Sequence, residues 1–183
     1  MRVIAGTRRS MPLKTIPGVG TRPTQDRTKE TLFNVLQNDV PGSIFLDLFS
    51  GSGAIGIEAL SRGAKKAYLV ENNREAAGCI KANLEFTRFT EDAVLMETDA
   101  MTALKRLEGK IKFDIIFMDP PYNHDYEKEV LEYLAASGLI TDDTIIVIEA
   151  SNETKLDYIN ELGYSMNKVK KYKNNQHVFL NKN

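Results

Sequence analysis

Short apolar runs alternate with longer amphipathic stretches along most of this chain. The apolar runs predict strands at 44–49, 66–71, 93–98, 113–118 and 144–149. The stretches between them predict helices near 54–62, 73–86, 100–108 and 125–137. Because strands and helices follow one another in strict alternation, the pattern predicts an α/β fold, with a parallel sheet covered by helices on both faces.

Both ends of the chain depart from this alternation. A helix near 153–161 is followed by strand-like stretches at 164–172 and 176–181, which predict an antiparallel hairpin. At the other end, residues 2–5 and 11–16 predict a short hairpin around a basic turn. A helix then begins at an N-cap at Thr24 and runs to about residue 37. The sheet is therefore expected to be seven-stranded and mostly parallel, with a small N-terminal extension of hairpin and helix.

Composition narrows the class of protein. The 183 residues contain a single cysteine, Cys79, so no disulfide framework is possible and a cytoplasmic protein is expected. Cys79 lies in a helical pattern and is expected to serve packing. No run approaches the ~20 apolar residues of a membrane span, and the first residues lack the apolar core of a signal peptide.

The formal net charge of −1 conceals two basic ends. Residues 1–30 hold seven lysine and arginine residues against two acidic ones, and residues 165–183 hold five lysines and no acid. Basic groups at both ends of an acidic body favour contact with a polyanion such as nucleic acid. Solvated termini without a partner are the alternative.

A glycine loop follows the first predicted strand of the alternating region. Gly51, Gly53 and Gly56 match G-x-G-x-x-G between a strand and a helix. Glu71 ends the next strand twenty residues later, where a carboxylate accepts hydrogen bonds from ribose hydroxyls. The loop predicts an adenosine-containing cofactor in a Rossmann-like fold, and a tight turn that binds nothing is the alternative.

Two more carboxylates bear on which cofactor is expected and how it is held. Asp47 stands four residues before the loop, where its charge would repel a pyrophosphate and attract an ammonium or sulfonium group. We therefore expect S-adenosylmethionine rather than a nicotinamide dinucleotide. Asp99 ends the third strand, where it could accept the adenine amino group, cap the following helix, or do both.

The fourth strand ends in Asp119, Pro120, Pro121 and Tyr122. The two prolines fix the backbone, because each holds φ near −65° and lacks an N–H group. An acidic acceptor, a rigid carbonyl and an aromatic ring at the carboxyl end of a strand suit a planar group that carries an amino nitrogen. A strand terminator with no ligand is the alternative.

Together these motifs resemble the class I S-adenosylmethionine-dependent methyltransferases. The stretch 22–33, RPTQDRTKETLF, and the opening RVIAG resemble the RsmD-type 16S ribosomal RNA guanine-N2 methyltransferases. No His, Cys or Asp cluster has metal-ligand spacing and no segment indicates an oligomer interface, so we expect no metal and a monomer. The resemblance implies a bacterial enzyme that modifies one guanine of small-subunit RNA. It also implies an RNA-contacting extension at 1–40 and a methyltransferase domain at 41–183.

The expected site residues fall into three groups. Catalysis is assigned to Asp119, Pro120 and Tyr122. Cofactor binding is assigned to Thr24, Arg27, Glu30, Asp47, Phe49, Ser50, Gly51, Gly53, Glu71, Asn72, Asp99, Ala100 and Asp119, the first three through the resemblance. RNA contact is assigned to Arg8, Arg9, Lys14, Pro121, Tyr122, Lys170, Lys171 and Lys173.

Three other functions remain as alternatives. An adenine-N6 methyltransferase would also act on a conjugated amine. An NAD-dependent oxidoreductase would need a hydride-transfer site that the sequence does not offer. A ribosome assembly factor could keep the fold without catalysis. His124 is a candidate for substrate contact or proton transfer, but amine methylation needs no strong base. His177 is expected to be structural or exposed.

Overall fold

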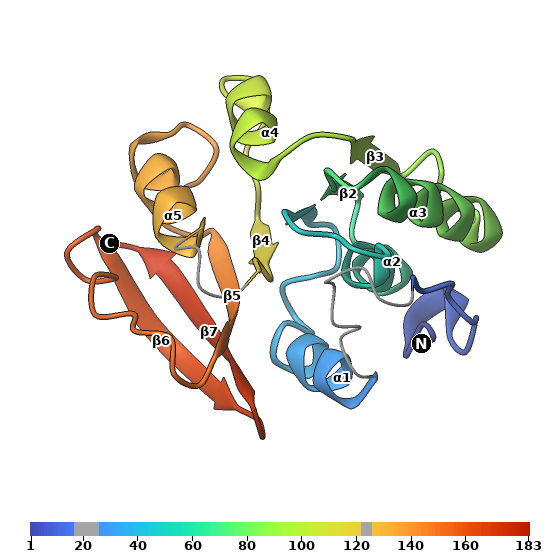
Figure 1. Cartoon of the computed structure of the whole chain (residues 1–183), viewed down its shortest axis with the longest axis horizontal. Helices are drawn as coiled ribbons and strands as arrows, with labels where there is room; N and C mark the ends of the chain where they lie inside the picture. The colour runs from blue at the N-terminus through green and yellow to red at the C-terminus, as the bar shows by residue number, and fades with distance from the viewer. Residues whose placement is uncertain (17–25, 122–125) are drawn as a thin grey trace.

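A computed structural model describes residues 1–16, 26–121 and 126–183. Seven strands form one sheet in the order β3-β2-β1-β4-β5-β7-β6 (Figure 1). The parallel strands are β1 (Ile44–Asp47), β2 (Lys66–Val70), β3 (Ala93–Met96), β4 (Ile115–Met118) and β5 (Ile145–Ser151). The antiparallel strands are β6 (Tyr164–Lys171) and β7 (Asn175–Lys182).

The described residues contain five α-helices, which cover both faces of the sheet. They are α1 (Asp26–Val35), α2 (Ala54–Ser61), α3 (Arg74–Thr87), α4 (Ala100–Leu107) and α5 (Tyr126–Ala136). One apolar cluster joins α1, α2 and α3 to one face of the sheet, and a second joins α4 and α5 to the other. All four side chains of β4 are buried, as expected for a central strand with both faces covered. The expected doubly wound α/β fold is confirmed.

The order of the strands creates a crevice beside β1. The chain builds β2 and β3 on one side of β1 and then returns to build β4 on the other side. In open α/β sheets, ligands bind outside the carboxyl ends of the strands at such a reversal. Asp47, the last residue of β1, lies in register with Phe117 of β4, so the glycine loop and the Asp119 motif leave the sheet next to each other.

The predicted helix at 153–161 is wrong, because this segment forms turns. Its backbone bonds span three residues, as in Ile159 N to Leu156 O at 3.2 Å. The Ser151 hydroxyl accepts from the Glu153 N–H, and such local side-chain bonds compete with helix formation. The predicted C-terminal hairpin is confirmed, with β7 inserted between β5 and β6.

The N-terminal hairpin is reduced to one bridge, between Arg2 and Pro12, because a proline cannot donate to a ladder. A 3-10 turn at Gly6–Arg8 takes the place of a longer ladder. Gly6 has φ of +82°, and an added Cβ would lie 1.7 Å from the Ser61 carbonyl oxygen, so only glycine fits there. The predicted N-cap at Thr24 lies outside the described residues.

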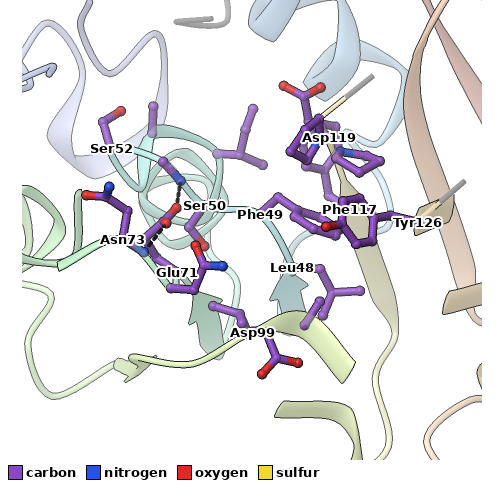
Figure 2. Close-up of a pocket in the computed structure, with 18 of the residues that line it drawn as sticks. Leu48, Phe49, Ser50, Ser52, Glu71, Asn73, Asp99, Phe117, Asp119 and Tyr126 are labelled. Carbon is purple, nitrogen blue, oxygen red and sulfur yellow. Dashed lines mark hydrogen bonds between the residues drawn. The ribbon is translucent and has the colours of Figure 1, made fainter. Parts of the chain in front are cut away.

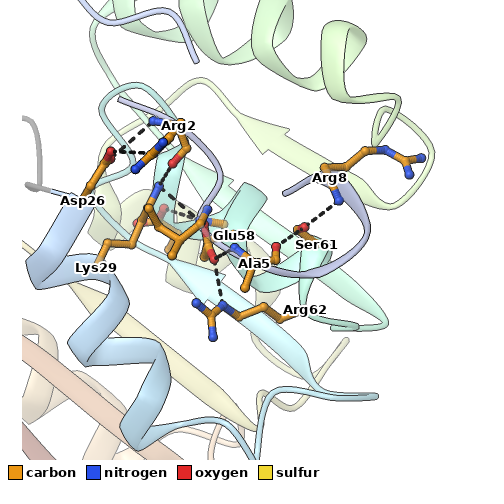
Figure 3. Close-up of polar contacts among 11 residues, drawn as sticks. Arg2, Ala5, Arg8, Asp26, Lys29, Glu58, Ser61 and Arg62 are labelled. Carbon is orange, nitrogen blue, oxygen red and sulfur yellow. Dashed lines mark hydrogen bonds and ion pairs between the residues drawn. The ribbon is translucent and has the colours of Figure 1, made fainter. Parts of the chain in front are cut away.

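Figure 3 shows how the N-terminal residues are attached to α2. Glu58 is fully buried and accepts from the backbone N–H groups of Ile4 (2.8 Å) and Ala5 (3.0 Å). The same carboxylate accepts from Arg62 Nε at 2.7 Å. One buried acid therefore joins the start of the chain to the helix that follows the glycine loop.

Lys29 completes this network. Its Nζ lies 3.5 Å from Glu58 and donates to the Arg2 carbonyl at 2.6 Å, and none of its surface is exposed. Burial lowers the pKa of Lys29, and the Glu58 carboxylate opposes this effect. Lys29 is one of the seven basic residues of segment 1–30, but its ammonium group lies inside the molecule and is not available to a polyanion.

Candidate active site

A cavity of about 660 Å³ opens at the carboxyl ends of the parallel strands (Figure 2). The glycine loop and Glu71 line one side, and Phe117, Asp119 and Tyr126 line the other. This volume is ordinary for a site that holds a small molecule or cofactor.

The glycine loop is held in place by the neighbouring strands. Gly51 and Gly53 adopt φ of +55° and +79°, a left-handed conformation that favours glycine. The Ser50 N–H donates to the Val70 carbonyl at 2.9 Å, and the Ser50 hydroxyl donates to the Asp47 carbonyl at 2.9 Å. The loop therefore lines the cavity through Ser50, Gly51 and Ser52, and its shape is fixed.

Glu71 connects the loop to the second strand. Its two carboxylate oxygens accept from the N–H groups of Gly51 and Asn73, each at 2.8 Å. A carboxylate oxygen has more than one lone pair, so these bonds leave acceptor capacity on a side chain that lines the cavity. The chemistry of Glu71 fits ribose hydroxyls, and Asn72 lines the cavity beside it.

Asp47 lies beneath the loop, and it is not among the residues that line the cavity. It is 1% exposed, and its Oδ2 accepts from the Gly56 N–H at 3.2 Å. Among the described residues, its Oδ1 has no hydrogen-bond partner. Burial, and secondarily the charge of Glu71, raises the pKa of Asp47 to about 7. The sequence argument that chose a cofactor from a free charge at this position therefore does not hold.

Asp99 and Ala100 also line the cavity. Asp99 caps α4, because its Oδ1 accepts from the Thr102 N–H at 2.9 Å, and this bond lowers the pKa of Asp99. The side chain is exposed to solvent. The two roles that the sequence left open for Asp99 are therefore compatible.

The opposite wall carries the Asp119 motif. Asp119 is half-buried, Pro120 is buried and Pro121 is exposed, and all three line the cavity. The strands beneath are fixed, since the Leu48 N–H donates to the Phe117 carbonyl at 3.0 Å. Tyr122 and His124 lie outside the described residues.

Sequence reasoning missed an aromatic residue on this wall. Tyr126 begins α5 and is 39% exposed, and its ring centroid lies 6.1 Å from that of Phe49. Val130, one turn later, lines the same cavity. The helical spacing of Tyr126 and Val130 was a signal for a shared face, but the sequence did not show which face met the cavity.

The N-terminal segment supplies a further part of the wall, which sequence reasoning also missed. Met1, Thr15 and Ile16 line the cavity. No motif marks these residues, since their place depends on contacts with helices that follow much later in the chain. Arg27 and Glu30 are exposed on α1 and do not line the cavity, and Thr24 lies outside the described residues.

The structure separates the predicted RNA-contacting residues. β6 is antiparallel to β7, which is antiparallel to β5, so β6 ends at the same edge of the sheet as β5. Lys170 and Lys171 lie at that end, and Lys173 follows in the turn. These three lysines therefore lie at the edge that carries the cavity.

Arg8 and Arg9 lie at the opposite edge. The Arg8 N–H donates to the Ser61 hydroxyl at 3.0 Å, and Arg8 Nε donates to the Thr87 carbonyl at 2.6 Å. Ser61 and Thr87 end α2 and α3, which run away from the cavity. The Arg8 guanidinium also lies 5.1 Å from the centre of the Phe89 ring, so much of this side chain serves packing.

His177 has a structural setting. It is fully buried, with Nε2 2.9 Å from Glu149 and Nδ1 3.0 Å from the Tyr172 hydroxyl. Burial raises the pKa of Tyr172 to about 12.

In residues 1–16, 26–121 and 126–183, no group of three or more His, Cys, Asp or Glu side chains could hold a metal ion. None of the helices described is long and apolar enough to cross a membrane.

Comparisons with known proteins agree with this geometry. The family described as Conserved hypothetical protein 95 matches residues 1–181. The chain is 34% identical to Ribosomal RNA small subunit methyltransferase D of Haemophilus influenzae over 157 residues, 85% of this chain and 81% of that protein. It is 35% identical to the Escherichia coli protein of the same name over 156 residues, 85% of this chain and 77% of that protein.

A solved structure gives the same result for the fold. The structure of yhhF from Escherichia coli superposes with a TM-score of 0.84 at 31% identity, and covers 100% of this chain and 97% of that chain. The predicted resemblance to RsmD-type methyltransferases is thus confirmed. The chain belongs to the Conserved hypothetical protein 95 family.

Proposed function

We propose that this protein transfers a methyl group from S-adenosylmethionine to the exocyclic N2 of a guanine in small-subunit ribosomal RNA. One observation carries the proposal. The Asp119 motif, suited to an amino group, and the glycine loop with Glu71, suited to an adenosine, line the same cavity. The relatives named as small-subunit ribosomal RNA methyltransferases support the class of substrate.

The cofactor would lie along the loop side of the cavity. Glu71 would accept from the ribose hydroxyls, Asp99 would accept from the adenine amino group, and Leu48 and Ala100 would pack against the base. Asp47 would act indirectly, by holding the Gly56 N–H and thus the loop. When bound, S-adenosylmethionine supplies an electrophilic methyl group on a sulfonium.

Asp119 and the Pro120 carbonyl would receive the target amine. Both can accept hydrogen bonds from the guanine N2 amino group and hold its lone pair in line for attack. Positive charge develops on N2 as the new bond forms, and a carboxylate fixed nearby stabilises that charge. As N2 attacks the methyl carbon, the sulfur–methyl bond would break and leave a neutral thioether. The methylated nitrogen would then lose a proton, for which Asp119 is the nearest proposed acceptor.

The base itself would stack against aromatic rings. Phe49 and Tyr126 form an aromatic surface beside Asp119, and Tyr122 is expected to add to it. Such stacking contributes roughly 1–3 kcal/mol per base. A guanine reaches the cavity only when it is unpaired or turned out of its helix.

RNA would approach along the sheet edge that carries Lys170, Lys171 and Lys173, with Lys14 near the cavity and Arg8 and Arg9 more distant. Phosphate contacts position RNA and do not read its sequence. We also propose a monomer in the bacterial cytoplasm, where such a substrate occurs. In it, residues 1–40 form the RNA-contacting extension of a methyltransferase domain at 41–183.

The test is transfer of labelled methyl from S-adenosylmethionine to undermethylated small-subunit particles, to the corresponding naked RNA and to duplex DNA, followed by nucleoside analysis. N2-methylguanosine in either RNA sample is the expected product, and it would show which assembly state is the substrate. N6-methyladenine, or label in DNA alone, would overturn the guanine assignment. No transfer to any sample would favour an assembly factor.

A further inference from the structure

Asn83 is a buried amide that joins three parts of the molecule. It lies in α3 with 1% of its surface exposed. Its Oδ1 accepts from the Lys14 N–H at 2.8 Å, and its Nδ2 donates to the Lys14 carbonyl at 3.0 Å. The same Nδ2 donates to the Ser52 carbonyl at 2.9 Å.

These bonds use the amide fully and specifically. Both N–H groups of Nδ2 have carbonyl partners, and Oδ1 has a backbone donor, so an apolar residue of the same size would remove three hydrogen bonds to part-buried backbone groups. The Cys79 thiol adds a bond to the Lys14 carbonyl at 3.3 Å. Asn83 therefore fixes the position of residue 14 at both its N–H and its carbonyl.

The two segments that Asn83 joins both border the cavity. Thr15 and Ile16 follow Lys14 directly and line it, and Ser52 lines it from the glycine loop. Leu13 anchors the segment from the other side, since it is 6% exposed and its N–H donates to the Met1 carbonyl at 3.0 Å. A ligand in the cavity would therefore contact both residues 15–16 and the glycine loop. The Asn83 side chain sets the distance between these two segments.

We propose that Asn83 is a positioning residue that holds residues 13–16 as a wall of the cofactor cavity and couples this wall to the glycine loop. The proposal rests on the proposed function for the identity of the ligand. It assigns a role in cofactor affinity to a residue that does not line the cavity and to a segment that carries no motif.

The first test compares two variants of α3 by calorimetric titration with S-adenosylhomocysteine. Asn83→Leu removes the three bonds at nearly constant volume. Thr87→Val is the matched control, because Thr87 is also fully buried in α3 and, among the described residues, its hydroxyl donates only to carbonyls of its own helix, Asn83 at 2.7 Å and Leu84 at 3.3 Å. Asn83→Leu should raise the dissociation constant by about 10-fold or more, and Thr87→Val by less than about 2-fold.

The second test needs no variant. Hydrogen exchange of the wild-type protein is followed by mass spectrometry with and without saturating S-adenosylhomocysteine. Exchange at residues 13–16 should slow together with exchange at the glycine loop. Protection of the loop without any change at residues 13–16 would overturn the proposal, even if Asn83→Leu fails to fold.

The outcomes separate this inference from the proposed function. Wild-type protein that binds S-adenosylhomocysteine, while Asn83→Leu binds it equally well, overturns the role of Asn83 alone. Wild-type protein that does not bind S-adenosylhomocysteine overturns the proposed cofactor, and the inference with it.

Discussion

Asp47 and Asp119 stand at the ends of neighbouring strands, yet their surroundings give them different chemistry. Asp47 is sealed beneath the glycine loop, where burial raises its pKa to about 7. Asp119 is half-buried and lines the cavity. Because burial disfavours a charged carboxylate, Asp47 suits a structural hydrogen bond, while Asp119 keeps the access that an acceptor of the substrate amine needs.

The role of Asp119 can be separated from cofactor binding. Replacing Asp119 with Ala should lower turnover by at least about 100-fold, because it removes a charged acceptor fixed where positive charge develops. The affinity for S-adenosylhomocysteine should change little, since Glu71 and the glycine loop lie on the other side of the cavity. Turnover is measured by methyl transfer under single-turnover conditions and affinity by calorimetry. Turnover at the wild-type rate would remove Asp119 from the mechanism.

Asp47 should make stability depend on pH. The pKa of about 7 in the folded protein exceeds the value of about 3.9 expected for the unfolded chain. Between these values the folded state holds a proton that the unfolded state has lost, so this group lowers the free energy of unfolding as pH rises from about 4 to about 7. The Asp47→Asn variant should therefore lose this downward slope in urea unfolding between about pH 5 and pH 7. Parallel curves for the two proteins would show that Asp47 does not titrate in this range.

At the scale of the element, α4 offers a way to separate the two roles of Asp99. Asp99→Ala removes both the cap and the carboxylate, so it should cost about 1 kcal/mol of stability and weaken cofactor binding. Asp99→Ser keeps a capping oxygen and should restore the stability but not the affinity. Thermal unfolding and titration with S-adenosylhomocysteine measure the two effects. Full affinity in both variants would leave Asp99 as a cap alone.

The attachment of α1 and the N-terminal residues depends on one buried ion pair. Glu58→Gln leaves the Lys29 ammonium buried without its counter-charge, and we expect a loss of roughly 3–5 kcal/mol in the free energy of unfolding. Adding Lys29→Met should recover part of that loss, because the unpaired charge is then gone. The exposed pair Lys128 and Glu132 is the control, and removing it should cost less than about 0.5 kcal/mol. Urea unfolding of the single and double variants gives the coupling energy between Glu58 and Lys29. Additive effects of the two substitutions would contradict the prediction that these side chains stabilise each other.

The elements that sequence predicted well are those whose burial pattern is a simple repeat. The strand Ile115–Met118 is apolar throughout because both of its faces are covered, and such a run is visible in the sequence. The segment 153–161 misled the prediction because local bonds of the Ser151 hydroxyl compete with a helix. Lys29 misled it differently: a charge on a helix is usually exposed, and its buried partner Glu58 lies 29 positions away.

At the scale of the whole molecule, the topology explains which site residues could be predicted. The carboxyl ends of parallel strands share one edge, so Glu71, Asp99 and Asp119 could be expected to lie together once the strands were assigned. The wall formed by Thr15 and Ile16 could not be predicted, because it depends on contacts across about 70 positions, such as that between Lys14 and Asn83.

The positions of the basic residues on the molecule also depend on topology. The sequence has two basic ends, and the strand directions bring Lys170, Lys171 and Lys173 to the cavity edge while the turn with Arg8 lies at the other edge. If RNA is positioned from the cavity edge, the C-terminal hairpin carries more of the phosphate contact than the N-terminal turn. The excess of positive charge in a segment therefore does not by itself identify the surface that binds.

Salt dependence of binding tests this division. Each phosphate contact to single-stranded RNA contributes about 0.7 to the slope of log affinity against log salt. Replacing Lys170, Lys171 and Lys173 together with Ala should therefore lower the magnitude of that slope by up to about 2. The matched control replaces Lys65, Lys110 and Lys112, three exposed lysines that precede β2 and β4 at the opposite edge, and should leave the slope nearly unchanged. An equal decrease of the slope in both triple variants would mean that RNA binding depends on the total charge of the molecule. The C-terminal hairpin would then have no special part in bringing RNA to the cavity.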